Sequence, residues 1–253
     1  APWFCSLAQR DDMAVSVIYL RHLHGAQQGV GFGTAFEWDV PLLSGYPSSC
    51  IDALPGWRGA AFGIWPLLRA LRSACADVIV LTGWQEPLLA LVLPLARCLG
   101  IAVIVRGESN AMRPRGKAAS LVHRIFLRFA NAVVTIGRSN REFYRRAGVR
   151  ADRTFGGAYF VDNEHFLAML ARHGDTASGS VTDLPTPVTF AFCGKHVAFK
   201  RPDMLVEAAG KLVHQGMPVR LRFAGSGEMT AQLQARCIAL GVEAEFVGFL
   251  NQT

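Results

Sequence analysis

Short apolar runs alternate with helical patterns along most of the chain, and this alternation is the feature that most limits its fold. Runs rich in β-branched residues predict strands at 14–20, 77–82, 102–105 and 132–136. Helical patterns occupy 1–9, 62–74, 86–98, 117–129 and 139–147, with Ser139 as the expected N-cap of the last, while 21–60 is irregular. Strands that alternate with helices of this length are typical of βαβ units. The sequence therefore predicts an α/β protein with parallel sheets, in which the wholly apolar run at 77–82 is a strand covered on both faces.

A polar stretch at 173–187 (HGDTASGSVTDLPTP) interrupts this alternation and has the composition of a linker. The alternation then restarts, with strands at 188–193, 219–224 and 244–248 and helices at 202–215 and 228–240. We therefore expect a first Rossmann-like domain at 1–172, a linker at 173–187 and a second, partial Rossmann-like domain at 188–253. Three strands make a small core for the second domain.

The composition favours a globular, intracellular protein. Hydrophobic residues make up 51% of the 253 positions and charged residues only 18%, so a core is available and disorder is not expected. The longest apolar stretch, 87–105, is broken by Arg97 and Gly100 and does not suit a membrane span. The six cysteines are scattered and form no C-x-x-C pair, which indicates buried thiols in a reducing compartment, and hence a cytoplasmic protein.

The positive charge is concentrated in one block. The net charge is +7, but residues 101–150 hold eleven Arg and Lys against two Glu, a net +9. Within this block the helix expected at 117–129 is amphipathic and carries several basic residues. It either packs on its own domain or contacts an anionic membrane surface.

Two lysines share the loop after the strand expected at 188–193. The chain has only four lysines beside 22 arginines, and Lys195 and Lys200 both lie between Gly194 and the next helix. Ligands of parallel sheets bind at the carboxyl ends of the strands, where a helix N-terminus also attracts anions. The next strand is followed by a second loop, Gly225, Ser226 and Gly227, whose glycines would allow a ligand to approach the backbone closely. The pair of loops predicts a phosphate or diphosphate site, although each loop alone could hold surface lysines and turn glycines.

Two common nucleotide motifs are absent from the sequence. No G-x-x-x-x-G-K-[ST] occurs, and GVGFGT at 29–34 lacks the last glycine of the dinucleotide-binding fingerprint. These absences lower the P-loop NTPase and dehydrogenase interpretations.

Longer segments resemble glycosyltransferase family 4. FAFCGKHVAFKRPDMLVEAAGKL, VRLRFAGSGEM and AEFVGFLNQT are similar to the donor-binding half of that family, while ADVIVLTGWQEPLLALVLPLARCLGIAVIVRGES, NAVVTIGRSNREFYRRAGV and AYFVDNEHF resemble its acceptor side. The resemblance implies the GT-B architecture, two Rossmann-like domains facing across a cleft. It also implies retaining transfer of a hexose or pentose from a nucleotide sugar to a hydroxyl of a glycan or a lipid-linked saccharide, as in polysaccharide biosynthesis.

The resemblance also assigns the donor-site residues. Gly194, Lys195 and Lys200 match the positions that hold the donor diphosphate, and Gly225, Ser226, Gly227, Gly248 and Phe249 match the donor loops. Lys195 stands where the family usually has arginine, so the bidentate fork is lost while the charge is kept. The family's paired glutamates would lie beyond Thr253 and its first strand before Ala1, so the resemblance implies a fragment that is itself inactive.

Acceptor-side candidates follow the strands expected at 77–82 and 102–105. Glu108 is the candidate catalytic carboxylate, which would bind sugar hydroxyls or accept a proton. Arg106 and Ser109 flank it, and Trp84 could stack on a sugar ring, with Gly83 and Glu86 beside it. Alternatively, Glu108 is paired with Arg106, and Trp84 belongs to the core.

No metal or other cofactor is expected, because the seven histidines show no H-x-x-x-H or H-E-x-x-H spacing. The expected partners are a nucleotide sugar, a glycan or lipid-linked acceptor and an anionic membrane surface on the cytoplasmic side, with no nucleic acid. Two other interpretations remain open: a non-catalytic nucleotide-binding module, and a basic module that docks on a membrane or a nucleic acid.

Overall fold

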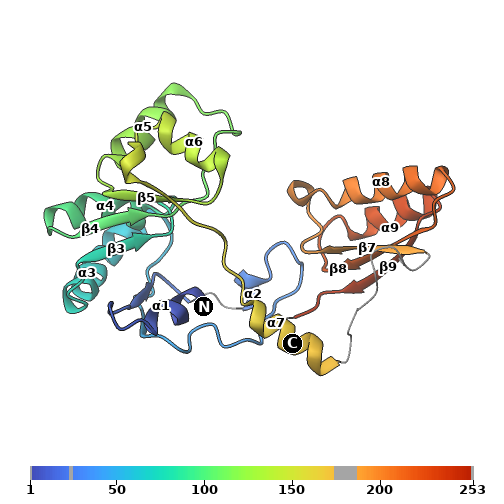
Figure 1. The fold of residues 1–253 in the computed structure, drawn as a ribbon, viewed down its shortest axis with the longest axis horizontal. Coiled ribbons are helices and arrows are strands. Elements are labelled where there is room, and N and C mark those ends of the chain that lie inside the picture. The colour runs from blue at the N-terminus through green and yellow to red at the C-terminus, as the bar shows by residue number, and fades with distance from the viewer. Residues whose placement is uncertain (1, 23–24, 174–186, 252–253) are drawn as a thin grey trace. The chain divides into compact units, whose positions relative to one another are not determined.

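A computed structural model describes residues 2–22, 25–173 and 187–251 (Figure 1). These residues form two compact units. The first comprises Ala1–His22 with Leu43–Asp162, and the second comprises Leu23–Leu42 with Asn163–Thr253. Both are built on parallel sheets, so the predicted α/β class is confirmed. Among the described helices, none combines the length and the apolar character that crossing a membrane requires.

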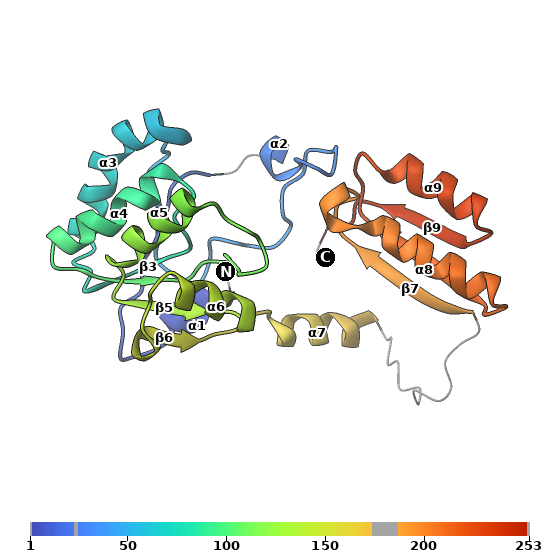
Figure 2. The same ribbon diagram turned by 90° about the horizontal axis from the view of Figure 1, so that it is seen from above.

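The first unit holds a four-stranded parallel sheet in the order β3-β4-β5-β6 and a parallel pair β1-β2. Its strands are β1 (Val17–Tyr19), β2 (Ser48–Cys50), β3 (Val78–Leu81), β4 (Ala102–Val105), β5 (Ala132–Thr135) and β6 (Thr154–Gly156). Its helices are α1 (Pro2–Ala8), α3 (Gly56–Ser73), α4 (Pro87–Cys98), α5 (Lys117–Leu127), α6 (Arg138–Arg146) and the 3-10 turn η1 (Ala151–Arg153). Helix α3 packs against α4, and α4 packs against α5 (Figure 2).

The core of the first unit lies between the sheet and these helices. Val103 and Val105 of β4 and Val133 of β5 are fully buried, together with Leu93 of α4 and Tyr144 of α6. Since side chains alternate along a strand, the two valines of β4 face the same side of the sheet. This packing fixes the carboxyl ends of β3 and β4, from which the candidate acceptor residues follow.

The second unit holds a three-stranded parallel sheet in the order β7-β8-β9. Its strands are β7 (Val188–Cys193), β8 (Val219–Ala224) and β9 (Glu243–Gly248). Its helices are α2 (Gly25–Gln28), α7 (Asn163–His173), α8 (Pro202–His214), α9 (Thr230–Ala239) and the 3-10 turn η2 (Ala198–Lys200). Helices α8 and α9 lie on one face of the sheet (Figure 1), where Leu221 and Phe223 of β8 are fully buried.

The division into units differs from the expected boundaries. Segments 23–42 and 163–172, expected in the first domain, group with the second unit. The reason for 23–42 is direct contact: Lys195 Nζ donates to the Val30 carbonyl, and Ser226 Oγ donates to the Phe32 carbonyl at 2.6 Å. Helix α7 occupies 163–173, and most of the expected linker, 174–186, lies outside the described residues.

Several local expectations were wrong. Helix α3 starts at Gly56 rather than 62, and the region expected to be irregular contains α2 and β2. Ser139 lies inside α6, whose N-cap is Gly137, because the Ser139 hydroxyl accepts a bond from the Ala111 N–H instead. Strand β3 is not covered on both faces: Val78 and Val80 are 49% and 44% exposed, as alternate residues of a strand with only one covered face.

Candidate functional site

The carboxyl ends of β7, β8 and β9 are joined by backbone hydrogen bonds between their loops. The Gly194 N–H donates to the Ala224 carbonyl at 2.8 Å, and the Gly225 N–H donates to the Gly248 carbonyl at 2.7 Å. Beyond them, the His196 N–H donates to the Ser226 carbonyl at 2.8 Å. The predicted donor loops therefore meet at one edge of the second unit's sheet.

The glycines of the β8 loop are required by this close approach. A Cβ atom at Gly225 would lie 2.0 Å from the Gly194 carbonyl oxygen, and one at Gly227 would lie 2.6 Å from the His196 oxygen. Both glycines also have positive φ, at 135° and 154°. Only glycine tolerates both conditions. In this structure the glycines bring loop against loop, where the sequence interpretation had them approach a ligand.

Lys195 and Lys200 carry positive charge into the β7 loop without a carboxylate partner among the described residues. Lys195 is half-buried, and its ammonium lies 5.0 Å from the centre of the Phe32 ring in addition to its bond to Val30. Lys200, the last residue of η2, is exposed, with its ammonium 5.5 Å from the Phe199 ring. An ammonium group has three donors, so Lys195 keeps two for a ligand.

A pocket of about 480 Å³ opens beside these loops within the second unit. It is lined by Gly31, Phe32, Gly33, Val197, Ser226, Gly227, Glu228 and Thr230. Neither lysine forms part of this lining, although the side chain of Lys195 lies against Gly31, which does. Phe249 is not part of the lining, but its ring packs on Phe36 at 4.2 Å and on the lining residue Phe32 at 5.0 Å between ring centres.

His196, which follows Lys195 in the loop, anchors the loop to the interior of the second unit. Its side chain is fully buried, with ring contacts to Phe192, Phe223 and Phe246, and its Nδ1 pairs with Thr230 Oγ1 at 2.9 Å. Its Nε2 has no partner within the described residues. Burial lowers the pKa of His196, because the charged imidazolium loses its hydration. The lysine loop is therefore built around a neutral histidine.

The helix that follows the lysine loop begins under backbone strain. Arg201, its N-cap, has a left-handed φ of 53°, and its guanidinium pairs with Asp203 at 2.9 Å. Pro202 supplies the first helical position, where its missing N–H costs nothing. Hydrogen bonds from the Arg201 guanidinium, and to a smaller extent its charge, hold the pKa of Asp203 below its usual range. The Asp203 carboxylate therefore stays ionised, and the paired Arg201 compensates its charge at the helix end expected to face an anion.

A second pocket, of about 580 Å³, lies in the first unit at the ends of β3 and β4. Its lining includes three of the predicted acceptor-side residues, Trp84, Glu108 and Ser109, and also Gly83 and Glu86. The further lining residues are Thr82, Gln85, Leu89, Gly107, Arg113, Pro114, Arg115, Ala119 and His123. Polar and aromatic groups therefore converge where the sequence predicted an acceptor site.

Helix α6 positions the loop that carries Glu108. Asn140 is buried, and its amide donates to the carbonyls of Gly107 (3.0 Å) and Ser109, while the Gly107 N–H donates to the Tyr144 hydroxyl at 3.2 Å. Sequence reasoning missed both α6 residues. A signal was available in the sequence: Asn140 and Tyr144 are four residues apart, and so share one face of a helix whose other residues are mostly charged.

Glu108 is exposed and is not paired with Arg106. A hydrogen bond to the Glu108 carboxylate raises the pKa of Tyr159, and no ion pair to Glu108 occurs in the described part of the chain. Arg106 lies outside the pocket lining. Its guanidinium sits 5.5 Å from the Trp3 ring and 5.6 Å from the Tyr159 ring. Arg106 therefore packs on aromatic residues, as cationic planar groups commonly do.

Trp84 lines the pocket but also makes contacts within the protein. Its indole N–H donates to His123 Nδ1 at 3.2 Å, and its ring stacks with Phe143 at a centre distance of 6.5 Å. Burial and then the charge of Arg115 lower the pKa of His123. Because Nδ1 accepts this bond, the neutral ring carries its proton on Nε2. His123 is a pocket residue with acid–base capacity that the sequence did not single out.

Comparison with known proteins gives a family for this chain. A family model described as "Glycosyl transferase 4-like domain" matches residues 6–155, more than half of the sequence. The chain belongs to the glycosyl transferase 4-like family. No curated protein matches the sequence.

Solved structures share the fold at low sequence identity. The lipopolysaccharide outer core galactosyltransferase WaaB, in its apo form, has a TM-score of 0.59 at 13% identity, over 94% of this chain and 68% of that one. HepE from Anabaena in complex with UDP has a TM-score of 0.61 at 14% identity, over 94% and 70%. A glycosyltransferase from Rickettsia africae has a TM-score of 0.58 at 9% identity, over 94% and 69%. The α/β fold with parallel sheets is therefore that of GT-B glycosyltransferases.

Proposed function

We propose that this family member transfers a sugar from a nucleoside diphosphate sugar to an acceptor hydroxyl, with the donor in the second unit and the acceptor in the first. One observation carries the proposal: Lys195 and Lys200 have no carboxylate partner among the described residues and follow β7 at the edge where its loop joins that of β8. Anionic ligands of parallel sheets bind at such edges. The UDP in the Anabaena HepE structure supports a nucleoside diphosphate as the ligand.

In the proposed reaction the bond between the anomeric carbon and the diphosphate breaks, and negative charge grows on the departing phosphate. Lys200 and the free donors of Lys195 stabilise that charge, which lowers the barrier because the interaction strengthens in the transition state. The sugar passes through a state resembling an oxocarbenium ion. Retention of the anomeric configuration and a hexose or pentose donor are parts of this proposal, and NMR of the product would check both.

On the acceptor side Glu108 is the proposed catalytic residue. Its carboxylate lines the 580 Å³ pocket and has no cationic partner in the described residues, so it can accept a hydrogen bond or a proton from an acceptor hydroxyl. Ser109 and Trp84 offer a hydroxyl and an aromatic edge in the same lining. A glycan or lipid-linked saccharide is the acceptor class that such a lining suits.

The acceptor proposal includes a membrane surface on the cytoplasmic side. Helix α5 exposes Leu121, Val122 and Ile125 by 56%, 48% and 46%, so these side chains are not packed on the unit. Arg124 and Arg128 are exposed beside them, and no carboxylate occurs between Glu108 and Glu142. Exposed apolar groups among basic ones suit an interface with anionic lipid.

Helix α3 supports the same proposal. Phe62 and Trp65 are 77% and 72% exposed, and Arg58 and Arg69 lie on the same helical face at positions four residues away from them. The helix contains no acidic residue. Tryptophan is favoured at membrane interfaces, where its ring meets both the apolar and the polar layers.

Hydrogen exchange of the chain with and without UDP, GDP or ADP tests the donor proposal. At least one diphosphate should slow exchange at 194–202 and 225–230, and the matching monophosphate should do so less. Helix α4 (Pro87–Cys98), in the other unit, is the internal control and should not change. If all three diphosphates at saturation left both loops unprotected, the donor proposal would be wrong.

A further inference from the structure

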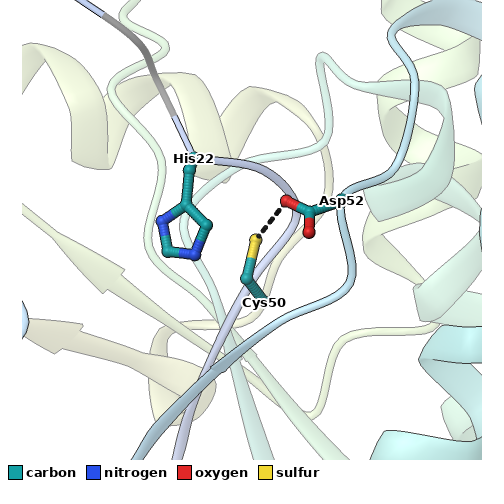
Figure 3. Close-up of side chains that lie close together, drawn as sticks. All are labelled: His22, Cys50 and Asp52. Atoms are coloured by element: carbon teal, nitrogen blue, oxygen red, sulfur yellow. Dashed lines mark hydrogen bonds between the residues drawn. The ribbon is translucent and has the colours of Figure 1, made fainter.

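Three side chains with metal-binding atoms converge in the first unit, and none of them lines either pocket. One ligand atom from each of His22, Cys50 and Asp52 lies within 4.8 Å of the others (Figure 3). The described residues contribute these three members to the cluster and no fourth. Nothing in the proposed donor or acceptor chemistry uses them.

The parallel pair β1-β2 brings the three residues together. Tyr19 and Cys50 are register partners at the ends of the two strands, so the chain that continues from each runs on side by side. Two backbone bonds extend the pairing: the Ile51 N–H donates to the Tyr19 carbonyl at 3.1 Å, and the Ala53 N–H donates to the Leu20 carbonyl at 2.6 Å. The cluster is therefore built on two strand ends fixed to each other.

The backbone turns Asp52 toward the cysteine. Asp52 has a left-handed φ of 47°, and its Oδ1 accepts a hydrogen bond from Cys50 Sγ at 3.1 Å. Aspartate visits this conformation more readily than most residues, at a cost of roughly 1 kcal/mol. The sulfur lies between the imidazole of His22 and the carboxylate of Asp52 (Figure 3).

This order of groups does not suit a cysteine nucleophile. In a nucleophilic triad the histidine stands between the nucleophile and the carboxylate, so that it can take the thiol proton and be oriented by the acid. Here the thiol bonds directly to the carboxylate. A cation placed among the three groups would instead meet one sulfur, one nitrogen and one oxygen.

We propose that His22, Cys50 and Asp52 bind a zinc ion. Thiolate, imidazole and carboxylate are the three ligand types that zinc takes in proteins, and three protein ligands leave a fourth position for water or a ligand. The nearby cation is already compensated, because Arg21 pairs with Glu86 at 2.9 Å and donates to the Ala53 carbonyl. His22 and Asp52 are exposed and Cys50 is half-buried, so an ion can reach the cluster from solvent.

Zinc binding replaces the thiol proton that Cys50 donates to Asp52, and that proton is released to solvent. The affinity should therefore rise with pH. The sequence predicted no metal, since His22 follows one strand, Cys50 and Asp52 lie at the end of another, and the three show no metal-binding spacing motif. The proposal is independent of the donor chemistry and does not place a metal on the diphosphate.

Titration of the chelator-treated chain with Zn²⁺, in competition with a chromophoric chelator, tests the proposal. We expect one tight equivalent per chain, with an affinity at least about tenfold lower in Cys50→Ser, His22→Ala and Asp52→Asn. Cys98→Ser is the matched control, because it removes an exposed thiol outside the cluster. Its affinity should equal that of the unsubstituted chain.

Titration with Co²⁺ gives a second measurement that does not depend on affinity alone. A thiolate-to-cobalt absorption band should appear in the unsubstituted chain and in Cys98→Ser, and should be missing in Cys50→Ser. Asp52→Asn, an isosteric change at an exposed residue, keeps the test valid if Cys50→Ser fails to fold. Zinc binding that Cys50→Ser and Asp52→Asn leave unchanged, or that Cys98→Ser abolishes, would overturn the proposal.

Discussion

His196 makes the second unit sensitive to acid. Burial lowers its pKa in the folded state, so below the unfolded value of about 6.5 the unfolded chain binds the proton more readily than the folded chain. The contribution of His196 to the free energy of unfolding should therefore be fully present above about pH 6.5. It should decrease as the pH falls from there toward the lowered pKa of the folded state. His123 in the first unit contributes in the same direction, because its pKa is also lowered.

Thermal unfolding from pH 8 to pH 5 measures this effect. His196→Leu keeps an apolar side chain among the three phenylalanines and removes the titrating group, so its melting temperature should depend less steeply on pH below about 6.5. His214→Leu, on the last turn of α8, is the control and should keep the original slope. An identical slope in His196→Leu would show that the buried imidazole is not the acid-sensitive group.

Because the β8 loop packs closely on the β7 loop, replacing glycine by alanine should cost more stability there than at a glycine in open space. Gly225→Ala combines left-handed strain with a clash against the Gly194 backbone, whereas Gly216→Ala shares the strain, with φ of 79°, but meets no atom within 4 Å. Gly216→Ala is therefore the control and should lose about 1 kcal/mol of stability. Gly225→Ala should lose a further 1–3 kcal/mol because of the clash. Denaturant unfolding compares the two, and equal losses would contradict the close approach.

Helices α3 and α5 predict membrane association. Co-sedimentation with vesicles should rise with anionic lipid and fall with salt, because the exposed arginines attract lipid headgroups within a short screening length. Trp65→Ala should reduce binding, since it removes an aromatic side chain that is 72% exposed. Ile238→Ala, on α9 of the other unit and 81% exposed, is the control. Equal binding to neutral and anionic vesicles would contradict the charge argument.

At the scale of the whole molecule, the local patterns predicted the architecture. Each strand and its following helix are close in sequence, so the alternation after residue 187 was recovered almost completely, as were β3 to β5 with α4 to α6. Strand β2 was missed because Ser48 to Cys50 is polar and short, and its pairing with β1 is long-range.

For the candidate sites, too, the sequence predicted the features that are local in the chain and missed the long-range contacts. The Lys195–Lys200 loop and its neighbouring glycines were visible because each follows a strand directly. Long-range contacts were not visible: Lys195 bonds to Val30, 165 positions away, and Asn140 holds the Glu108 loop from another helix. The direction of Arg106 was also unpredictable, since the Trp3 and Tyr159 rings come from distant segments.

The proposal that the edge of β7 holds a nucleoside diphosphate is tested most directly by calorimetry. Each charge-assisted contact contributes about 1.5–3 kcal/mol, so Lys195→Ala with Lys200→Ala should weaken UDP, GDP or ADP binding, whichever the chain prefers, by about 100-fold or more. Lys211→Ala, in the last turn of α8, removes a lysine away from the loop and should leave the affinity unchanged. Unchanged affinity in the double variant, or an equal loss in Lys211→Ala, would contradict a diphosphate site at this loop.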